Sequence, residues 1–137
     1  MTNSIKYNNR LEIKMNKIKN YLVAVLVSIC ITGVFGIPLG DPKFLVQAVI
    51  LESSFIALAI VSFKNFRYAY IPNFIIAGLV IVGNTISPKH LEIMSTFHPF
   101  YNAIVLIIGG YILQALLLIT NAMSLREYRN VKIEKSG

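Results

Sequence analysis

The sequence predicts an all-α integral membrane protein in which four helices cross the bilayer as an up-down-up-down bundle. The 137-residue chain is 55% hydrophobic and only 14% charged, with a mean hydropathy of +0.65, whereas about 25% of residues are charged in a typical soluble domain. Its apolar residues also gather in four runs, each close to the roughly twenty residues that a helix needs to cross the hydrocarbon of a bilayer. The composition therefore argues against both a soluble globular domain and a disordered chain.

The chain divides into a basic tail, a membrane domain and a second basic tail. The first tail, residues 1–19, holds five basic residues and one acid, and we expect it to lie frayed at anionic headgroups. Met15 opens the stretch MNKIKNYL, which also fits a natural start, so residues 1–14 are alternatively an over-extended start. The membrane domain covers residues 20–121, and the second tail covers residues 122–137.

The first predicted span covers residues 20–37 and ends before Pro38, because proline does not continue a helix. Its basic flank also fits a cleaved signal peptide, but Val34 and Gly36 match the small-residue cleavage pattern poorly, and the apolar run is long for such a signal. We therefore expect a retained helix. Cys30, the only cysteine, lies in this run as a small packing residue.

The second predicted span, residues 44–63, is the most continuous apolar run and follows a turn rich in proline and glycine. Only four residues separate it from the third predicted span, residues 68–86. A connection this short requires an antiparallel helical hairpin. Pro72 falls near the start of the third span, where its missing N–H does little harm.

The longest connection, residues 87–99, is polar with a proline near each end. We expect it to place a short segment on the membrane surface through its few apolar side chains. The fourth predicted span covers residues 100–120. Its Gly109-Gly110 pair is typical of helices that approach one another closely.

The positive charges predict the orientation of the chain. Eleven of the thirteen lysine and arginine residues lie before the first span, between the second and third spans, or after the fourth, and only Lys43 and Lys89 lie on the opposite side. Basic residues in short loops stay in the cytoplasm, so both termini are predicted to be cytoplasmic, in a multi-pass protein of the plasma membrane. Aromatic residues also cluster near the predicted boundaries, as in an aromatic belt. The inner cluster comprises Tyr21, Phe63, Phe66, Tyr68 and Tyr70.

One carboxylate, Glu52, lies near the middle of the second span, about 12 Å along the helix from its outer end. An ionised carboxylate at mid-bilayer costs at least about 2.5–3.5 kcal/mol, and no Lys, Arg or His lies within a predicted span to pair with it. Glu52 is therefore either protonated, or it faces water or a cation from a partner. The partners predicted at a similar depth are the hydroxyl groups of Ser28, Thr32 and Tyr111 and the backbone carbonyls near Gly109 and Gly110.

Two interpretations of Glu52 stay open. It is either the proton or cation site of a transporter, or a buried carboxyl that hydrogen-bonds to a neighbouring helix and fixes its packing. Gln47 and Ser54 lie on a different face of the same predicted helix, roughly 140–160° away at about 100° per residue. The polar residues of this helix therefore form no continuous stripe, which argues against a ready-made hydrophilic path.

Weaker candidates lie elsewhere in the chain. Three amide side chains are predicted to hydrogen-bond between helices or at the interface: Gln114, Asn84 and Asn102. His90 and His98 share the outer connection, but two histidines eight residues apart without a fixed scaffold are a poor ligand pattern. We therefore expect no metal site, and His90 and His98 remain weak candidates for one.

The sequence contains no motif that specifies a reaction or a ligand. No Ser-His-Asp or Cys-His grouping is placed for catalysis, and no histidine lies within a span to hold a haem, so we expect neither an enzyme nor a cofactor. The first hypothesis is an accessory or interaction subunit of a larger membrane complex. The alternative is a small oligomeric transporter or channel that uses Glu52 as a proton or cation site. The expected partners are the lipid bilayer and other membrane subunits or further copies of the chain, and not nucleic acid.

Overall fold

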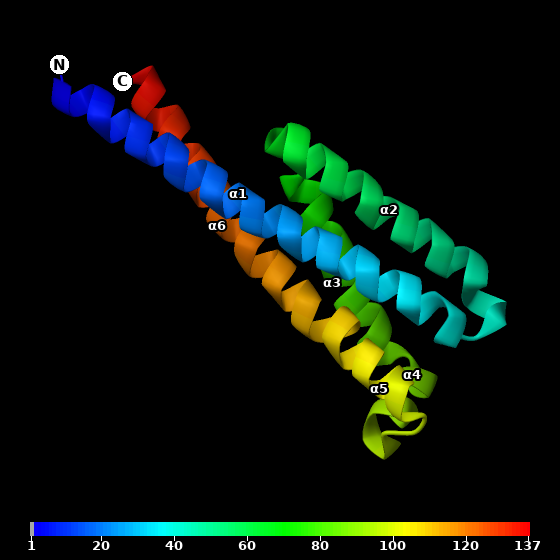
Figure 1. Cartoon of the computed structure of the whole chain (residues 1–137). Helices are drawn as coiled ribbons and strands as arrows, with labels where there is room; N and C mark the ends of the chain where they lie inside the picture. Colours follow the sequence, from blue (N-terminus) through cyan, green and yellow to red (C-terminus); the bar gives the residue numbers. More distant parts are fainter. Residues whose placement is uncertain (1) are drawn as a thin grey trace.

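The computed structural model describes residues 2–137, and every regular element in that range is a helix (Figure 1). This confirms the all-α class that the sequence predicts. Helix α1 (Thr2–Gly36) is 35 residues long. It contains no proline, and it ends where Gly36 and Pro38 follow one another closely, because both residues disfavour a continued helix.

Two short 3₁₀ turns, η1 (Ile37–Leu39) and η2 (Pro42–Phe44), reverse the chain after α1. Asp41 starts the second turn, because its side chain accepts a hydrogen bond from the Lys43 backbone N–H at 3.0 Å. Helix α2 (Leu45–Lys64) then folds back beside α1 (Figure 1). The second predicted span therefore matches α2 to within one residue at each end.

A further 3₁₀ turn, η3 (Phe66–Tyr68), leads into α3 (Tyr70–Ile86), which begins two residues later than predicted. The expected surface segment is a helix, α4 (Pro88–Thr96). The Ser87 side chain starts α4 by accepting a hydrogen bond from the His90 backbone N–H, and Pro88 occupies its first position. Helices α3 and α4 meet at 73°.

The last third of the chain is one continuous helical stretch of three parts. Helix α5 (Phe100–Ile107) passes into a π-helical turn, η4 (Ile108–Ile112), and then into α6 (Leu113–Ser136). A π-helical turn widens the helix by one residue and is often found at functional sites.

Helices α1 and α6 lie side by side and form the centre of the molecule, with both chain ends at one end of it (Figure 1). Helix α2 packs on α1, α3 packs on α6, and α2 contacts α3 only slightly. We call the end opposite the termini, formed by residues 37–44 and 87–99, the loop end. Because α2 and α3 are held by different neighbours, they leave space between them toward the loop end.

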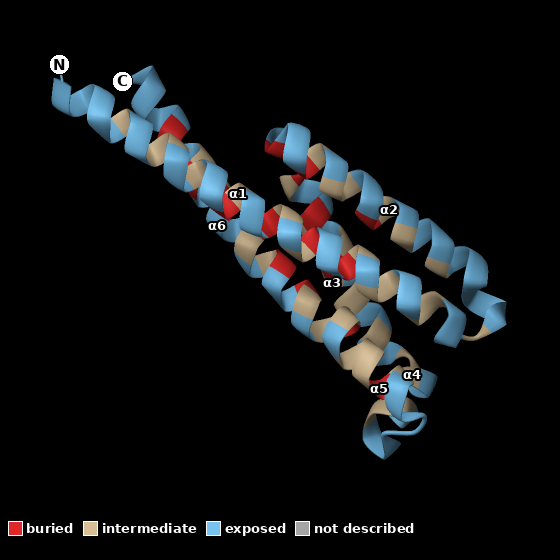
Figure 2. Ribbon diagram, in the orientation of Figure 1, coloured by how far each residue is buried: buried red, intermediate tan, exposed pale blue. Residues whose placement is uncertain are grey.

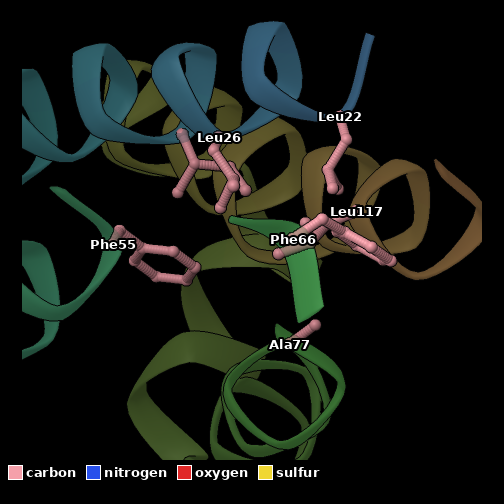
Figure 3. Close-up of a cluster of buried hydrophobic side chains, with 7 residues drawn as sticks. Leu22, Leu26, Phe55, Phe66, Ala77 and Leu117 are labelled. Carbon is pink, nitrogen blue, oxygen red and sulfur yellow. The ribbon is translucent and has the colours of Figure 1, made fainter. Parts of the chain in front are cut away.

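The hydrophobic core joins α1, α2, η3, α3 and α6 (Figure 3). Its buried residues are Leu22, Leu26, Ile29, Phe55, Phe66, Ala77 and Leu117. Figure 2 shows that buried residues follow the faces between helices, while the outward faces are exposed. Phe66 is part of this core, with its ring centroid 6.1 Å from that of Tyr70 and 6.4 Å from that of Tyr128. Phe66 therefore packs inside the bundle, and its place near the inner membrane boundary stays a prediction.

A buried polar network fixes the start of α3 between α2 and α6. The Asn73 amide nitrogen lies 3.2 Å from both Ser62 Oγ and Asn121 Oδ1, and Asn121 donates in turn to the Tyr70 carbonyl at 2.8 Å. Ser62, Asn73 and Asn121 are fully buried. Polar side chains of this kind link apolar helices through hydrogen bonds, so the network determines where the three helices meet.

Both predicted tails are helical, and they pair with each other. The Lys14 ammonium lies 2.8 Å from Glu127 Oε1, and the Lys135 ammonium lies 2.7 Å from Glu12 Oε1. The expectation that residues 1–19 form a frayed tail is therefore wrong, because α6 continues far enough to give them a partner helix. We call this pair of helical ends, residues 2–19 and 122–136, the paired arm.

Three helical stretches are long and apolar enough to cross a membrane. They are Thr2–Leu39, Pro42–Lys64 and Phe100–Ser136. The bent pair α3 and α4 is a fourth candidate. Length and composition therefore agree with three or four of the predicted apolar spans.

We predict that Asn73→Ala lowers the free energy of unfolding by about 1–3 kcal/mol, because it removes two interhelical hydrogen bonds and leaves buried groups without a donor. Unfolding in mixed micelles, followed by circular dichroism, measures the change. Ser53→Ala is the matched control, because the Ser53 hydroxyl donates only to the Val49 carbonyl of its own helix at 2.8 Å. Equal losses in the two variants would contradict the role assigned to the network.

Candidate functional site

A cavity of about 1100 Å³ opens toward the loop end, between α2 on one side and α3, α4 and α5 on the other. Helix α1 forms its back wall through residues from Ile29 to Gly36, and Gly109, Gly110 and Gln114 close its deep end. Pockets that hold drug-sized molecules typically measure about 300–1000 Å³. The cavity is therefore large enough for an organic ligand.

Glu52 extends from α2 into this cavity, directly against α1. A Cβ atom on Gly33 would overlap Glu52 Oε2, so the carboxylate occupies space that only a glycine leaves free. The other carboxylate oxygen, Glu52 Oε1, is buried and accepts no hydrogen bond from residues 2–137. The sequence-predicted carboxylate thus lies in a cavity with one oxygen unsatisfied.

Glycines of α1 and η4 bring three more polar side chains to the level of Glu52. Thr32, next to Gly33, packs its methyl group 2.9 Å from the position that a Cβ on Gly109 would take. A Cβ on Gly110 would overlap the amide of Asn84 from α3. Glu52, Thr32 and Asn84 therefore lie at one level of the bundle, although they come from three different helices.

Gln114 completes this level from α6. Its side-chain nitrogen donates to the Gly109 carbonyl at 3.0 Å, which folds the amide back along its own helix at the π-helical turn. Gln114 is 1% exposed, and its Oε1 atom accepts no hydrogen bond from the described residues. We call Glu52, Thr32, Asn84 and Gln114 the polar belt.

The predicted hydrogen-bond partners of Glu52 do not bind it. Ser28 donates to the Ala24 carbonyl and Thr32 to the Ser28 carbonyl, both at 2.8 Å and both within α1. The Tyr111 hydroxyl lies 3.1 Å from that of Thr85. For Ser28 and Thr32 the reason is that a serine or threonine in a helix often donates to a carbonyl one turn earlier, whereas the Tyr111 hydroxyl pairs with a side chain of α3. Thr32 lines the cavity, whereas Ser28 and Tyr111 do not.

The other amides follow the prediction in part. Asn102 donates to the Leu39 carbonyl at 3.0 Å and so joins α5 to η1. Asn84 reaches across to Gly110 of the neighbouring helix. Gln114 instead bonds within its own helical stretch. The sequence analysis missed the network around Asn73, although an asparagine in an apolar run is itself a signal of interhelical hydrogen bonding.

An ion pair joins the two segments of the loop end. The Lys89 ammonium lies 2.9 Å from Asp41 Oδ2, and through this hydrogen bond Lys89 holds the pKa of the Asp41 carboxyl below its usual value. Burial lowers the pKa of the His90 imidazole, and the nearby charge of Lys89 lowers it further. His90 is therefore neutral at pH 7, and its Nδ1 atom has no hydrogen-bond partner within the described chain.

His90 and His98 both line the mouth of the cavity. Between residues 2 and 137, no three His, Cys, Asp or Glu side chains lie close enough to hold a metal ion.

Comparisons of the chain with protein-family models, with curated proteins and with solved structures found no significant match. The cavity and its polar belt are therefore the features of the described chain that bear on its function.

We predict that Gly33→Ala destabilises the fold by about 1–3 kcal/mol, because the added methyl group must displace the Glu52 carboxylate or the helix that carries it. Gly78→Ala is the matched control, since nothing lies within 4 Å of its added Cβ. It should be neutral or stabilising by up to about 1 kcal/mol through helix propensity.

The same unfolding assay tests the cause. The double variant Gly33→Ala/Glu52→Ala should recover most of the loss, because the overlapping side chain is gone. A Gly33→Ala variant as stable as Gly78→Ala would show that Glu52 does not lie against Gly33.

Proposed function

We propose that the chain is a small multi-pass protein of the plasma membrane that crosses the bilayer four times with both termini in the cytoplasm. Three observations support this topology. The helices are of crossing length, their outward faces are apolar, and eleven of thirteen basic residues fall on one predicted side. Both chain ends also lie at the same end of the molecule (Figure 1), as an even number of crossings requires. In this proposal α1 is retained, since Leu22, Leu26 and Ile29 belong to the core.

Helix α3 makes the third crossing in this arrangement, with α4 lying at the outer surface. At 17 residues α3 is about 26 Å long, which is near the lower limit for a crossing helix. The 73° bend before α4 then marks the membrane boundary. The loop end, with its cavity mouth, faces outward.

A cysteine-labelling experiment tests the topology. In a Cys30→Ala background, Ser95→Cys on α4 should react with an impermeant maleimide added to intact cells. Ser136→Cys, at the end of α6, should react only after the membrane is opened. Both serines are exposed, so accessibility within the protein does not limit either reaction. Labelling of Ser136→Cys from outside would overturn the proposed orientation.

We propose further that the protein is a transporter that binds a cation at Glu52 in exchange for a proton. The carrying observation is the buried, unpartnered Glu52 Oε1 in a cavity that reaches the loop end. A carboxylate at this depth is costly unless it is neutralised. No basic side chain lies in the described part of the four spans to do so, which leaves a proton or a bound cation. A site that accepts either one couples their movements.

The polar belt supports this function over a packing role for Glu52. A carboxyl that only fixed helix packing would donate to a neighbouring helix, but its predicted partners bond elsewhere. The belt instead gathers one carboxylate, two amides and a hydroxyl around the deep end of one cavity. The neighbouring π-helical turn is consistent with a functional site.

Modification by a lipophilic carbodiimide, which reacts with protonated carboxyl groups in apolar surroundings, tests the exchange. Mass spectrometry should find the adduct at Glu52 and not at the exposed Glu134 of the paired arm. At least one cation from a panel of sodium, potassium and organic ammonium ions should reduce the adduct severalfold. Glu52→Gln should abolish it. The absence of an adduct at Glu52 in the folded protein would overturn the proposed site.

The second candidate is the accessory subunit of a larger membrane complex, and the paired arm favours it. Helix α1 is about 52 Å long, well beyond a hydrocarbon core of about 30 Å, and α6 accompanies it. The arm therefore extends charged helices into the cytoplasm, where another subunit has access to them. Purification in mild detergent separates the two candidates. A transporter should appear as a homo-oligomer, and an accessory subunit as part of a stoichiometric assembly with other proteins.

A further inference from the structure

The residues of the cavity indicate which class of cation it binds, and not only that its ligand is positively charged. The inference below rests on the proposed cation site at Glu52 and names the class of cation. It uses three observations: the hydrogen-bonding groups left without partners, the balance of charge around the cavity, and the character of the walls.

The unpartnered groups of the cavity include two acceptors that cannot donate. Glu52, in its ionised form, and Gln114 both line the cavity, and the Oε1 atom of each is buried and receives no hydrogen bond from residues 2–137. The neutral His90 ring leaves Nδ1 as a third unpartnered atom nearer the mouth. A buried acceptor without a donor costs about 1–3 kcal/mol. A ligand that supplies several N–H donors removes this cost.

The charged residues around the cavity favour a cation. Three carboxylates line it, those of Asp41, Glu52 and Glu92, against the single ammonium of Lys89. Lys89 is already paired with Asp41 at 2.9 Å. The remaining negative charge is therefore available to attract a positively charged ligand into the cavity.

The walls favour an organic cation over a metal ion. The cavity is lined mainly by apolar side chains, including Ile29, Leu51, Phe55, Val80, Val105 and Leu106. A metal ion needs several ligands that converge within about 2.6 Å, and the described residues contain no group of three His, Cys, Asp or Glu side chains placed to hold one. A volume of about 1100 Å³ instead suits a molecule with an apolar body.

We infer that the cavity binds a lipophilic primary ammonium ion, whose N–H groups donate to Glu52 and Gln114 while its apolar body lies along the wall formed by α1, α2 and α5. Binding exchanges one ion for another: the protonated Glu52 carboxyl releases its proton, and the carboxylate then pairs with the ammonium group. No bond to carbon is made or broken. A quaternary ammonium ion carries the positive charge but has no N–H donor, so it pairs with the carboxylate without donating a hydrogen bond to either acceptor.

Three organic probes that share a phenylethyl group, together with sodium, test this inference on the full-length protein in detergent. They are 2-phenylethylammonium, its trimethylammonium analogue, the uncharged 2-phenylethanol, and sodium. Proton release in weak buffer and protection of Glu52 from the carbodiimide are the readouts. The primary ammonium should bind at least about tenfold more tightly than the other three, since a hydrogen bond to a charged group is worth about that factor or more.

Two variants test whether Glu52 and Gln114 accept the hydrogen bonds of the ligand. Glu52→Gln should reduce affinity for the primary ammonium at least about tenfold and abolish proton release. Gln114→Leu should reduce the ratio of the affinity for the primary ammonium probe to the affinity for the trimethylammonium probe, because it removes only the second acceptor. Glu134→Gln, on the paired arm and outside the cavity, is the control and should change neither value.

The outcomes separate this inference from the proposed function. Protection by sodium alone, or equal binding of the two ammonium probes, would overturn the inference and leave a cation site at Glu52 in place. Equal binding of 2-phenylethanol would overturn the role of charge. If no carbodiimide adduct forms at Glu52, the proposed function fails and the inference fails with it. Because the comparison of probes uses the unmodified chain, it holds even if a variant does not fold.

Discussion

Polar groups removed from water need partners, and this requirement divides the molecule into two halves. In the half near the α2–α3 connection, hydrogen bonds join the helices: Asn73 donates to Ser62 and Asn121, although its own Oδ1 atom accepts no hydrogen bond from the described residues. In the half near the loop end, Glu52 Oε1 and Gln114 Oε1 have no partner among the described residues, and both residues line the cavity. The first half is therefore a packing joint, while the second holds unpartnered groups beside a cavity.

The position of α2 follows from this division. Its inward face carries Phe55 and Ser62, the two residues of α2 that are buried, and both help to join it to the core or to the polar network. Toward the loop end α2 keeps contact with α1, where Gly33 leaves room for Glu52, but it has little contact with α3. The cavity thus lies where α2 and α3 have little contact, between the joint at Ser62 and Asn73 and the loop end.

The length of α1 and α6 has a different origin. These helices exceed the thickness of a hydrocarbon core, and their polar ends stay helical because each provides the other with an ion-pairing and packing surface. The pairs Lys14–Glu127 and Lys135–Glu12 lie in the order that antiparallel helices require. Nine of the eleven basic residues that predict the orientation of the chain are therefore carried on a structured arm rather than on loose tails. Sequence reasoning did not find this arm, because a polar segment with few apolar residues gives no sign of a distant partner.

The amino-acid sequence by itself determined the helical class, the apolar runs and the position of a carboxylate, Glu52, inside one of them, because the length of an apolar run and the cost of a charge inside it are local properties. Only the tertiary structure decided which groups surround that carboxylate. Matching residues by depth suggested Ser28, Thr32 and Tyr111, yet their hydroxyls bond to their own helix or to Thr85. The polar belt depends on the rotation of four helices about their axes and on the glycines between them. That rotation is fixed by packing between segments far apart in the chain. The spacing of residues within one segment carries no information about such packing.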